Sequence, residues 1–166
     1  MASMGFGHRA GGIFSKRISA TLYYWISVDI HSGDVLVGPV FPRLTKKIYE
    51  IAGLTSIPAK RTFPMTWGPP AFSHRLGALA DEKLNSACSL VDIAERFLSD
   101  KTDLDRVIEA LKRGELFSWN RIQVVAAGLA VLGKCNQLQE LAREHDHGSA
   151  AEFVRTAVSL CEREFS

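Results

Sequence analysis

The stretch from Leu22 to Ile30 reads LYYWISVDI, and it decides the fold of the N-terminal part of the chain. Leu22 and every second residue after it are apolar or aromatic, and aromatic and β-branched side chains dominate the stretch. This pattern is typical of a β-strand that buries one face. We therefore predict a strand whose buried face begins with Leu22 and whose opposite face carries Trp25.

Two shorter strands are expected beside this stretch. Ile13–Ile18 precedes it, and turn residues at 31–34 lead into a further strand that starts over Val35–Val37. Pro39 has no amide hydrogen, so it either ends that strand or confines it to a sheet edge. Consecutive strands joined by short turns predict an antiparallel meander.

Helical spacing of apolar residues begins after this meander. It covers Pro42–Ala52, and Gly53 follows as a C-terminal cap. The segment Leu54–Phe72 contains four prolines, which favours an extended loop with at most one edge strand, around Thr62–Trp67.

The chain after Phe72 is patterned for helices. Apolar residues form one-sided stripes, and Ser, Thr and Gly stand where these stripes begin and end. Arg121–Leu132 is apolar on nearly all sides, so we predict that it lies in the middle of a helical bundle. The other helices are predicted over 84–98, 102–113, 138–141 and 149–161.

These elements predict the α+β class. We expect an N-terminal antiparallel β-meander of about three to four strands, packed with a C-terminal bundle of about four to five helices. The length of 166 residues is typical of a single domain. We assign this domain to residues 4–166, with a sheet-rich part at 5–75 and a helical part at 76–166. Residues 1–3 precede a second methionine and are interpreted as an expression scar.

Charge is distributed unevenly along the chain. The net charge is +2, but residues 1–76 carry +6 and residues 77–166 carry −4. Because the N-terminal half is basic, a nucleic-acid-binding module remains a second alternative. Its lysines and arginines come singly or in pairs and not in a long run. For its aromatic residues, a packing role is favoured. The candidates for that module are Lys16, Arg17, Tyr23, Trp25, Arg43, Lys60 and Arg61. The longest apolar run, Ile122–Leu132, is too short to cross a bilayer, so no membrane partner is predicted.

The three cysteines are Cys88, Cys135 and Cys161. Their number is odd, their spacings are wide, and all three fall in helical patterns. We therefore expect reduced, buried thiols and a cytoplasmic location.

Two motifs have the residue types of ligand sites, but we interpret both as segments that bind no ligand. The glycine-rich opening, Gly5–Gly12, precedes a strand and leads into no helix, so we expect a flexible lead-in and not a phosphate-binding loop. His145-Asp146-His147 is the one local histidine cluster, and we expect it in a solvated loop. We predict no metal, no cofactor and no catalytic residue.

Two surface features favour a protein partner. Trp67 lies in a rigid Trp-Gly-Pro-Pro element, and several acids lie opposite the apolar stripes of their helices. The predicted partner contacts are Trp67, Asp92, Glu95, Asp103 and Asp105. The alternative is an enzyme whose catalytic residues are dispersed in the sequence, with His74 or His31 meeting Asp29 or Glu50 in a deep pocket.

The opening GFGHRAGGIFSKRI and the aromatic strand after it resemble a family of small bacterial proteins of unassigned function. The stretch from Asn120, ending in Leu-Gly-Lys, is similar to the C-terminal helix of that family. The matching N-terminal positions are Gly5, Phe6, Arg9, Gly12, Phe14, Arg17 and Trp25. Similar α+β domains occur beside bacterial toxins as immunity proteins. The resemblance implies a non-enzymatic protein that binds and neutralises a cognate toxin domain, and it transfers no catalytic residue.

Overall fold

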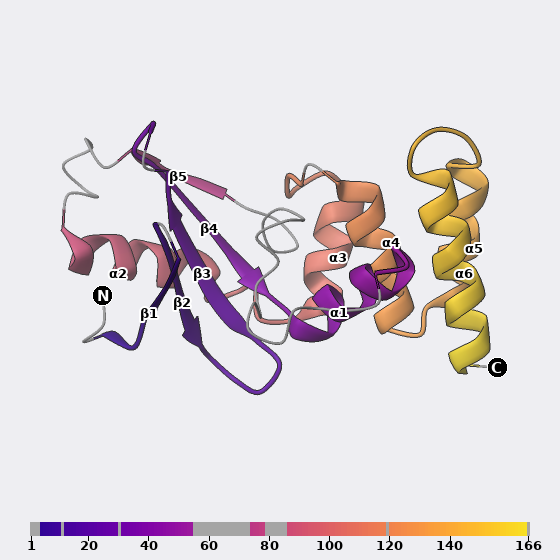
Figure 1. The fold of residues 1–166 in the computed structure, drawn as a ribbon, viewed down its shortest axis with the longest axis horizontal. Helices are drawn as coiled ribbons and strands as arrows, with labels where there is room; N and C mark the ends of the chain where they lie inside the picture. The colour runs from indigo at the N-terminus through magenta and orange to yellow at the C-terminus, as the bar shows by residue number, and fades with distance from the viewer. Residues whose placement is uncertain are drawn as a thin grey trace. The chain divides into compact units, whose positions relative to one another are not determined.

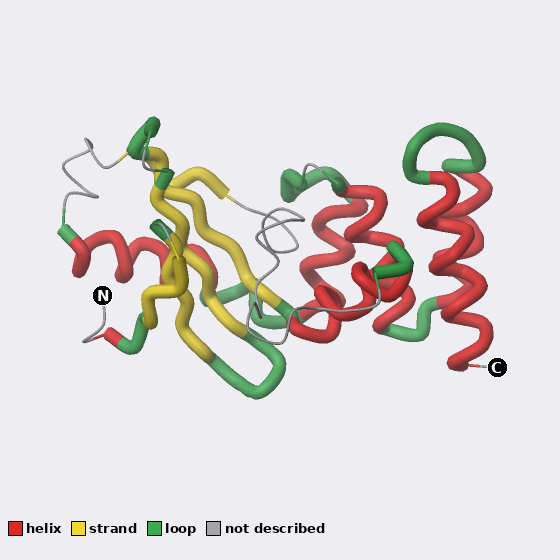
Figure 2. Tube along the Cα trace, viewed as in Figure 1, coloured by secondary structure: helices red, strands yellow, loops and turns green. Residues whose placement is uncertain are grey.

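The computed structural model describes residues 4–10, 12–29, 31–54, 74–78, 86–118 and 120–165, and it has a mixed α+β architecture (Figures 1 and 2). The predicted α+β class and its antiparallel sheet are confirmed. The chain clusters into two compact units. The sheet unit comprises Met1–Phe41 and Pro69–Asp103, and the helical unit comprises Pro42–Gly68 and Leu104–Ser166. The single domain predicted for residues 4–166 stays a prediction.

The sheet unit is built on five antiparallel strands that lie side by side in chain order. In the register of the central strands, Trp25 stands opposite Ser15 on one side and Gly38 on the other, while Tyr24 stands opposite Lys16 and Pro39. The strands are β1 (Gly7–Ala10), β2 (Ile13–Arg17), β3 (Tyr23–Val28), β4 (Asp34–Val40) and β5 (His74–Ala78).

Two of these strands were not predicted. The glycine-rich opening is not a flexible lead-in, because β1 pairs with β2 and Phe6 beside it is only 1% exposed. Gly12 closes the turn between them, where a Cβ would lie 2.1 Å from the carbonyl oxygen of Val28. The glycine at this position thus permits a close backbone approach. At the other edge, β5 adds a strand where the pattern suggested helices.

The central strand β3 is buried on both faces at its middle. Tyr24 and Ile26 lie in the core as predicted, but Trp25 on the opposite face is only 8% exposed. The prediction of a single buried face is therefore wrong at this position, whereas the burial of Trp25 agrees with the packing role favoured for it. The small neighbours of Trp25 in the register, Ser15 and Gly38, leave room for its indole ring.

Pro39 lies inside β4, and the sheet accommodates it. The pairs between β4 and β5 end at Val37, so Pro39 lies beyond them and is paired in register with Tyr24 of β3. The missing amide hydrogen of Pro39 therefore breaks no pair with β5. The predicted edge strand at Thr62–Trp67 lies outside the described residues.

Helix α2 (Ala87–Leu98) packs against β3 and β4 of the sheet unit (Figure 1). It begins after Ser86, whose hydroxyl oxygen accepts a hydrogen bond from the amide of Ser89 at 3.1 Å. Its buried face consists of Leu90, Val91, Ala94 and Leu98. This helix was predicted as part of the C-terminal bundle, and it belongs instead to the sheet unit.

The helical unit is arranged around α4 (Arg121–Val131), whose residues from Val124 to Ala130 are all buried. This confirms the prediction that the helix lies in the middle of a bundle. Helix α4 packs against four helices, which are α1 (Pro42–Ile51), α3 (Leu104–Lys112), α5 (Cys135–Glu144) and α6 (Ala151–Phe165). A Cβ at Gly128 would lie 2.3 Å from the Cδ1 of Ile108, so the small residue lets α3 approach closely. The left-handed φ of Gly114 and Gly133 confirms where the helices before them end.

The cysteines differ from the prediction of three reduced, buried thiols. Cys135 and Cys161 form a disulfide between α5 and α6, with their Cα atoms 5.7 Å apart, and Cys88 is a free, exposed thiol near the start of α2. Packing of α5 against α6 brings the two cysteines together across 26 residues of sequence. The argument for a cytoplasmic location from reduced thiols is therefore removed.

One lysine is nearly buried in the helical unit. Lys47 of α1 is 9% exposed, and its ammonium group lies 2.6 Å from a carboxylate oxygen of Glu164 in α6 and 2.9 Å from one of Glu50. Burial lowers the pKa of Lys47, but the hydrogen bonds to Glu164 and Glu50 outweigh it, so the pKa is raised above its usual 10.5. These ion pairs hold α1 to the end of α6.

We expect the free energy of unfolding to fall as the pH rises above about 10.5. The folded pKa of Lys47 lies above the unfolded value, so its contribution is complete below the unfolded pKa and is lost as the pH passes through the folded pKa. Tyr24, whose pKa is also raised, adds to the same alkaline loss. Urea titrations between about pH 8 and pH 11.5 will measure the decline. This decline should be smaller in Lys47→Met than in the unchanged chain. In the exposed control Lys46→Met it should equal that of the unchanged chain. Equal declines in the two variants would contradict the role of Lys47.

Candidate functional site

Three strands of the sheet fix the candidate site, which is the outer face of α2. The hydroxyl of Tyr24 in β3 donates a hydrogen bond to the carbonyl oxygen of Leu98 at 3.1 Å. The His74 ring of β5 stacks on Phe97 with centroids 4.3 Å apart, and Lys16 of β2 pairs with Glu95. Contacts with three strands restrict the motion of α2, so its outward side chains are presented on a rigid support.

Charged side chains lie close together at the C-terminal half of this helix and just after it. The pKa of Tyr24 is raised, first by burial and then by the nearby carboxylates of Glu95 and Asp100. Lys101 donates to Asp100, which lowers the pKa of that carboxyl group, and the Lys101 ammonium lies 4.3 Å from the centre of the Phe97 ring. Beside β2, the Lys16 ammonium lies 5.7 Å from the centre of the buried Phe6 ring. Glu95 of α2 and Asp100 just after it thus lie near aromatic rings and lysines.

The predicted partner contacts fall in different places. Asp92 and Glu95 both lie on α2, where Asp92 is exposed and makes no ion pair within the described part of the chain, whereas Glu95 pairs with Lys16. Asp103 is exposed at the end of the sheet unit. Asp105 belongs to the helical unit and pairs with Lys134. Trp67 lies outside the described residues.

The candidate catalytic residues of the enzyme alternative have local structural partners. A carboxylate oxygen of Asp29 accepts hydrogen bonds from the amides of His31 and Ser32 at 2.8 and 3.2 Å, and these bonds lower the pKa of Asp29. His74 stacks on Phe97, as described above, and Glu50 pairs with Lys47 of its own helix. The side chain of Asp29 therefore stabilises the turn between β3 and β4.

The candidate nucleic-acid residues are only partly brought together: Arg17, Tyr23 and Trp25 share one face of the sheet, because Arg17 is paired in register with Tyr23. Lys16 and Trp25 occupy opposite faces of the sheet, because Lys16 is paired in register with Tyr24 and not with its neighbour. Burial of Trp25 leaves little of its ring for stacking on a base. Arg43 is exposed on α1 of the helical unit, and Lys60 and Arg61 lie outside the described residues.

The histidine cluster at the end of α5 is solvent-exposed at Asp146 and His147, whereas His145 caps the helix and is half-buried. The His147 ring lies 3.3 Å from a carboxylate oxygen of Asp146, and both side chains are exposed. Over residues 4–165, apart from the ranges that the structure leaves out, no three His, Cys, Asp or Glu side chains gather in a way that fits a metal ion. The prediction that the chain needs no metal stays a prediction.

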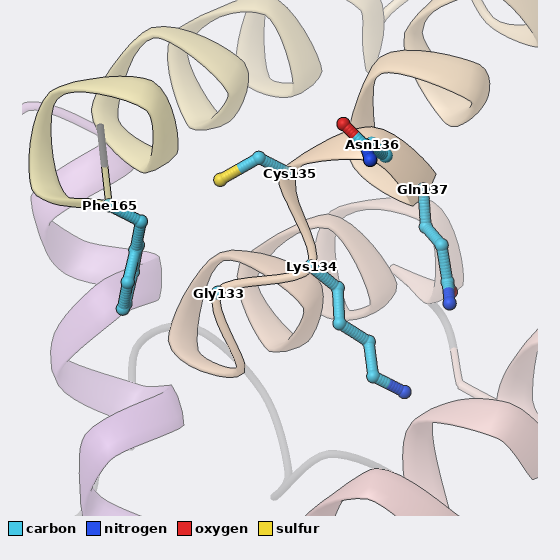
Figure 3. Close-up of a pocket in the computed structure, with 6 residues that line it drawn as sticks. All are labelled: Gly133, Lys134, Cys135, Asn136, Gln137 and Phe165. Atoms are coloured by element: carbon cyan, nitrogen blue, oxygen red, sulfur yellow. The ribbon is translucent and has the colours of Figure 1, made fainter.

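A shallow, open depression of about 390 Å³ lies in the helical unit at the turn between α4 and α5 (Figure 3). The Phe165 ring closes one side against Gly133, and the Cys135 sulfur points toward the helix that carries Phe165 (Figure 3). None of the residues predicted from the sequence as catalytic or partner-binding lines it. Its lining residues are Gly133, Lys134, Cys135, Asn136, Gln137 and Phe165. Cys135 could have drawn attention only as a cysteine that comes three residues after the end of a predicted helix at Leu132.

Comparison with known proteins finds no matching family model, no significant match among curated proteins and no significant match among solved structures. Among the described helices, none combines the length and apolar character needed to cross a bilayer.

Proposed function

We propose that this chain is a non-enzymatic protein that binds a partner protein, and that the partner is a bacterial toxin domain which it neutralises. The observation that supports this best is the charged outer face of α2, held on the sheet through Tyr24, His74 and Lys16. A surface that is already rigid loses little conformational entropy on binding, which favours a tight complex. Such a protein acts in the cytoplasm, where it meets a toxin made in the same cell.

Asp92 is the proposed anchor of this surface. It is exposed and unpaired among the described residues, so its charge is available to a basic group of a partner. Charge complementarity speeds encounter and selects the partner, and a close interfacial pair adds affinity. Glu95, one helical turn away, pairs with Lys16 and therefore contributes less free charge.

The enzyme alternative has less support. Asp29 is engaged with backbone amides of its own turn and Glu50 with a lysine of its own helix, so both serve local structure. The nucleic-acid alternative has less support for a similar reason, since Trp25 is buried and Lys16 is neutralised by Glu95.

The proposal predicts that a toxin domain is encoded beside this chain, and that domain is the binding partner used in the test. We expect co-expression to protect cells from that domain, and Asp92→Lys to weaken its binding by about tenfold or more in calorimetry. The matched control is Glu140→Lys, the same charge change at an exposed position of α5, which should bind as the unchanged chain does. No binding by the unchanged chain, or turnover of a substrate that depends on His31 or His74, would refute the proposal.

A further inference from the structure

The Cys135–Cys161 disulfide joins two residues that differ in exposure. Cys135 is the first residue of α5, is partly exposed and lines the open depression, whereas Cys161 is completely buried in α6. The depression offers a small thiol or disulfide in solution a route to Cys135, whereas Cys161 is shielded by the surrounding helices.

The two sulfurs also differ in how well they carry a negative charge. Cys135 stands at the N-terminus of the ten-residue helix α5, where the helix dipole favours a thiolate. Burial removes the hydration of a thiolate at Cys161 and therefore disfavours it. Because the thiolate is the attacking species in exchange reactions, Cys135 has the properties of an attacking thiol and Cys161 those of a resolving one.

We propose that Cys135 is a thiol–disulfide exchange site whose reactant is a small thiol or its disulfide, of the glutathione type, with Cys161 as the resolving cysteine. In oxidation, the Cys135 thiolate attacks a small disulfide, forms a mixed disulfide and releases one small thiolate. The Cys161 sulfur then attacks the Cys135 sulfur of the mixed disulfide, gives up its proton to solvent and releases the second small thiolate. Two cysteine thiols are oxidised and one small disulfide is reduced to two thiols.

Exchange at Cys135 changes how firmly the end of α6 is held. The disulfide is the covalent tie between that end and α5, and Glu164 and Phe165 follow Cys161 within one turn. Reduction leaves the ion pair of Glu164 with Lys47 and the contact of the Phe165 ring with Gly133. The same depression thus contains the reactive sulfur and one of the contacts that reduction leaves in place.

The test uses all 166 residues with Cys88→Ser, because the exposed thiol of Cys88 reacts with the same probe. This chain is reduced and exposed to oxidised glutathione, and samples are acid-quenched, alkylated and peptide-mapped over time. We expect a glutathione adduct on Cys135 that decays as the Cys135–Cys161 bond forms. Adding Cys161→Ser should leave a stable glutathione adduct on Cys135. Adding Cys135→Ser instead should give an adduct on Cys161 that forms about tenfold or more slowly than the adduct on Cys135.

Circular dichroism of each variant separates chemistry from loss of fold. If Cys135→Ser unfolds the chain, the rates at the two thiols are compared instead in the reduced Cys88→Ser chain by brief alkylation with iodoacetamide. An adduct that appears first on Cys161, equal rates at both thiols, or no adduct on either in the folded chain would overturn the proposal. The test needs no partner protein, so its outcome is independent of the proposed function.

Discussion

Replacing Phe6 with alanine will lower the free energy of unfolding by about 3–5 kcal/mol. The Phe6 ring is 1% exposed, so the substitution removes buried apolar surface and leaves a cavity. The Lys16 ammonium lies near this ring and pairs with Glu95, so loss of the ring also removes packing beneath that pair. Urea denaturation, monitored by circular dichroism, measures the change. The dependence of the free energy of unfolding on urea concentration is compared between the two chains as well.

Phe117→Ala is the matched control, because its ring is 60% exposed. We expect this substitution to change the free energy of unfolding by less than about 1 kcal/mol. A similarly small effect at Phe6 would mean that the N-terminal segment does not belong to the core, and the sequence-based interpretation of a flexible lead-in would then be restored.

The contrast between β3 and β1 shows which parts of the fold a sequence can predict. Tyr23–Val28 alternates over enough residues to identify a strand, and the apolar run of α4 identifies a central helix. The four residues of β1 contain His8 and Arg9 and have no such pattern. Their extended conformation depends on pairing with β2, which is a tertiary contact. The cue that was available is Phe6, a large apolar residue between two glycines.

The same limit applies to the candidate site. The exposure of Asp92 followed from its position opposite the apolar stripe of its helix, which local periodicity reveals. The pairing of Glu95 with Lys16 spans 79 residues, so no local pattern indicates it. The sequence predicted that Asp92 and Glu95 are both free acids on α2. In the structure Asp92 is exposed, whereas the charge of Glu95 is neutralised by Lys16.

The disulfide was missed because helix periodicity does not identify which two helices pack together. Cys135 begins one helix and Cys161 lies near the end of another, so their meeting depends on how α5 and α6 pack. An odd number of cysteines in one chain also favoured free thiols, although one pair and one free thiol satisfy the same count. The separate surroundings of Cys88 and of the bonded pair become visible only in three dimensions.

Reducing the Cys135–Cys161 disulfide will lower the free energy of unfolding by about 3 kcal/mol. The bond closes a loop across 26 residues, and it restricts the unfolded chain more than the folded one. The helical unit carries the bond, so its helices should melt at a lower urea concentration once the bond is open. We would measure this by circular dichroism at 222 nm, a wavelength at which α-helices dominate, with and without dithiothreitol.

The Cys88→Ser variant supplies the control, because its thiol is outside the bond and exposed on α2. We expect this variant to respond to dithiothreitol as the unchanged chain does, while Cys135→Ser and Cys161→Ser should be insensitive to it and match the reduced chain. Identical urea transitions with and without reductant would contradict the stabilising role of the bond. If only Cys161→Ser lowered the free energy of unfolding, packing of this buried side chain, and not the disulfide, would be what holds α6 against α5.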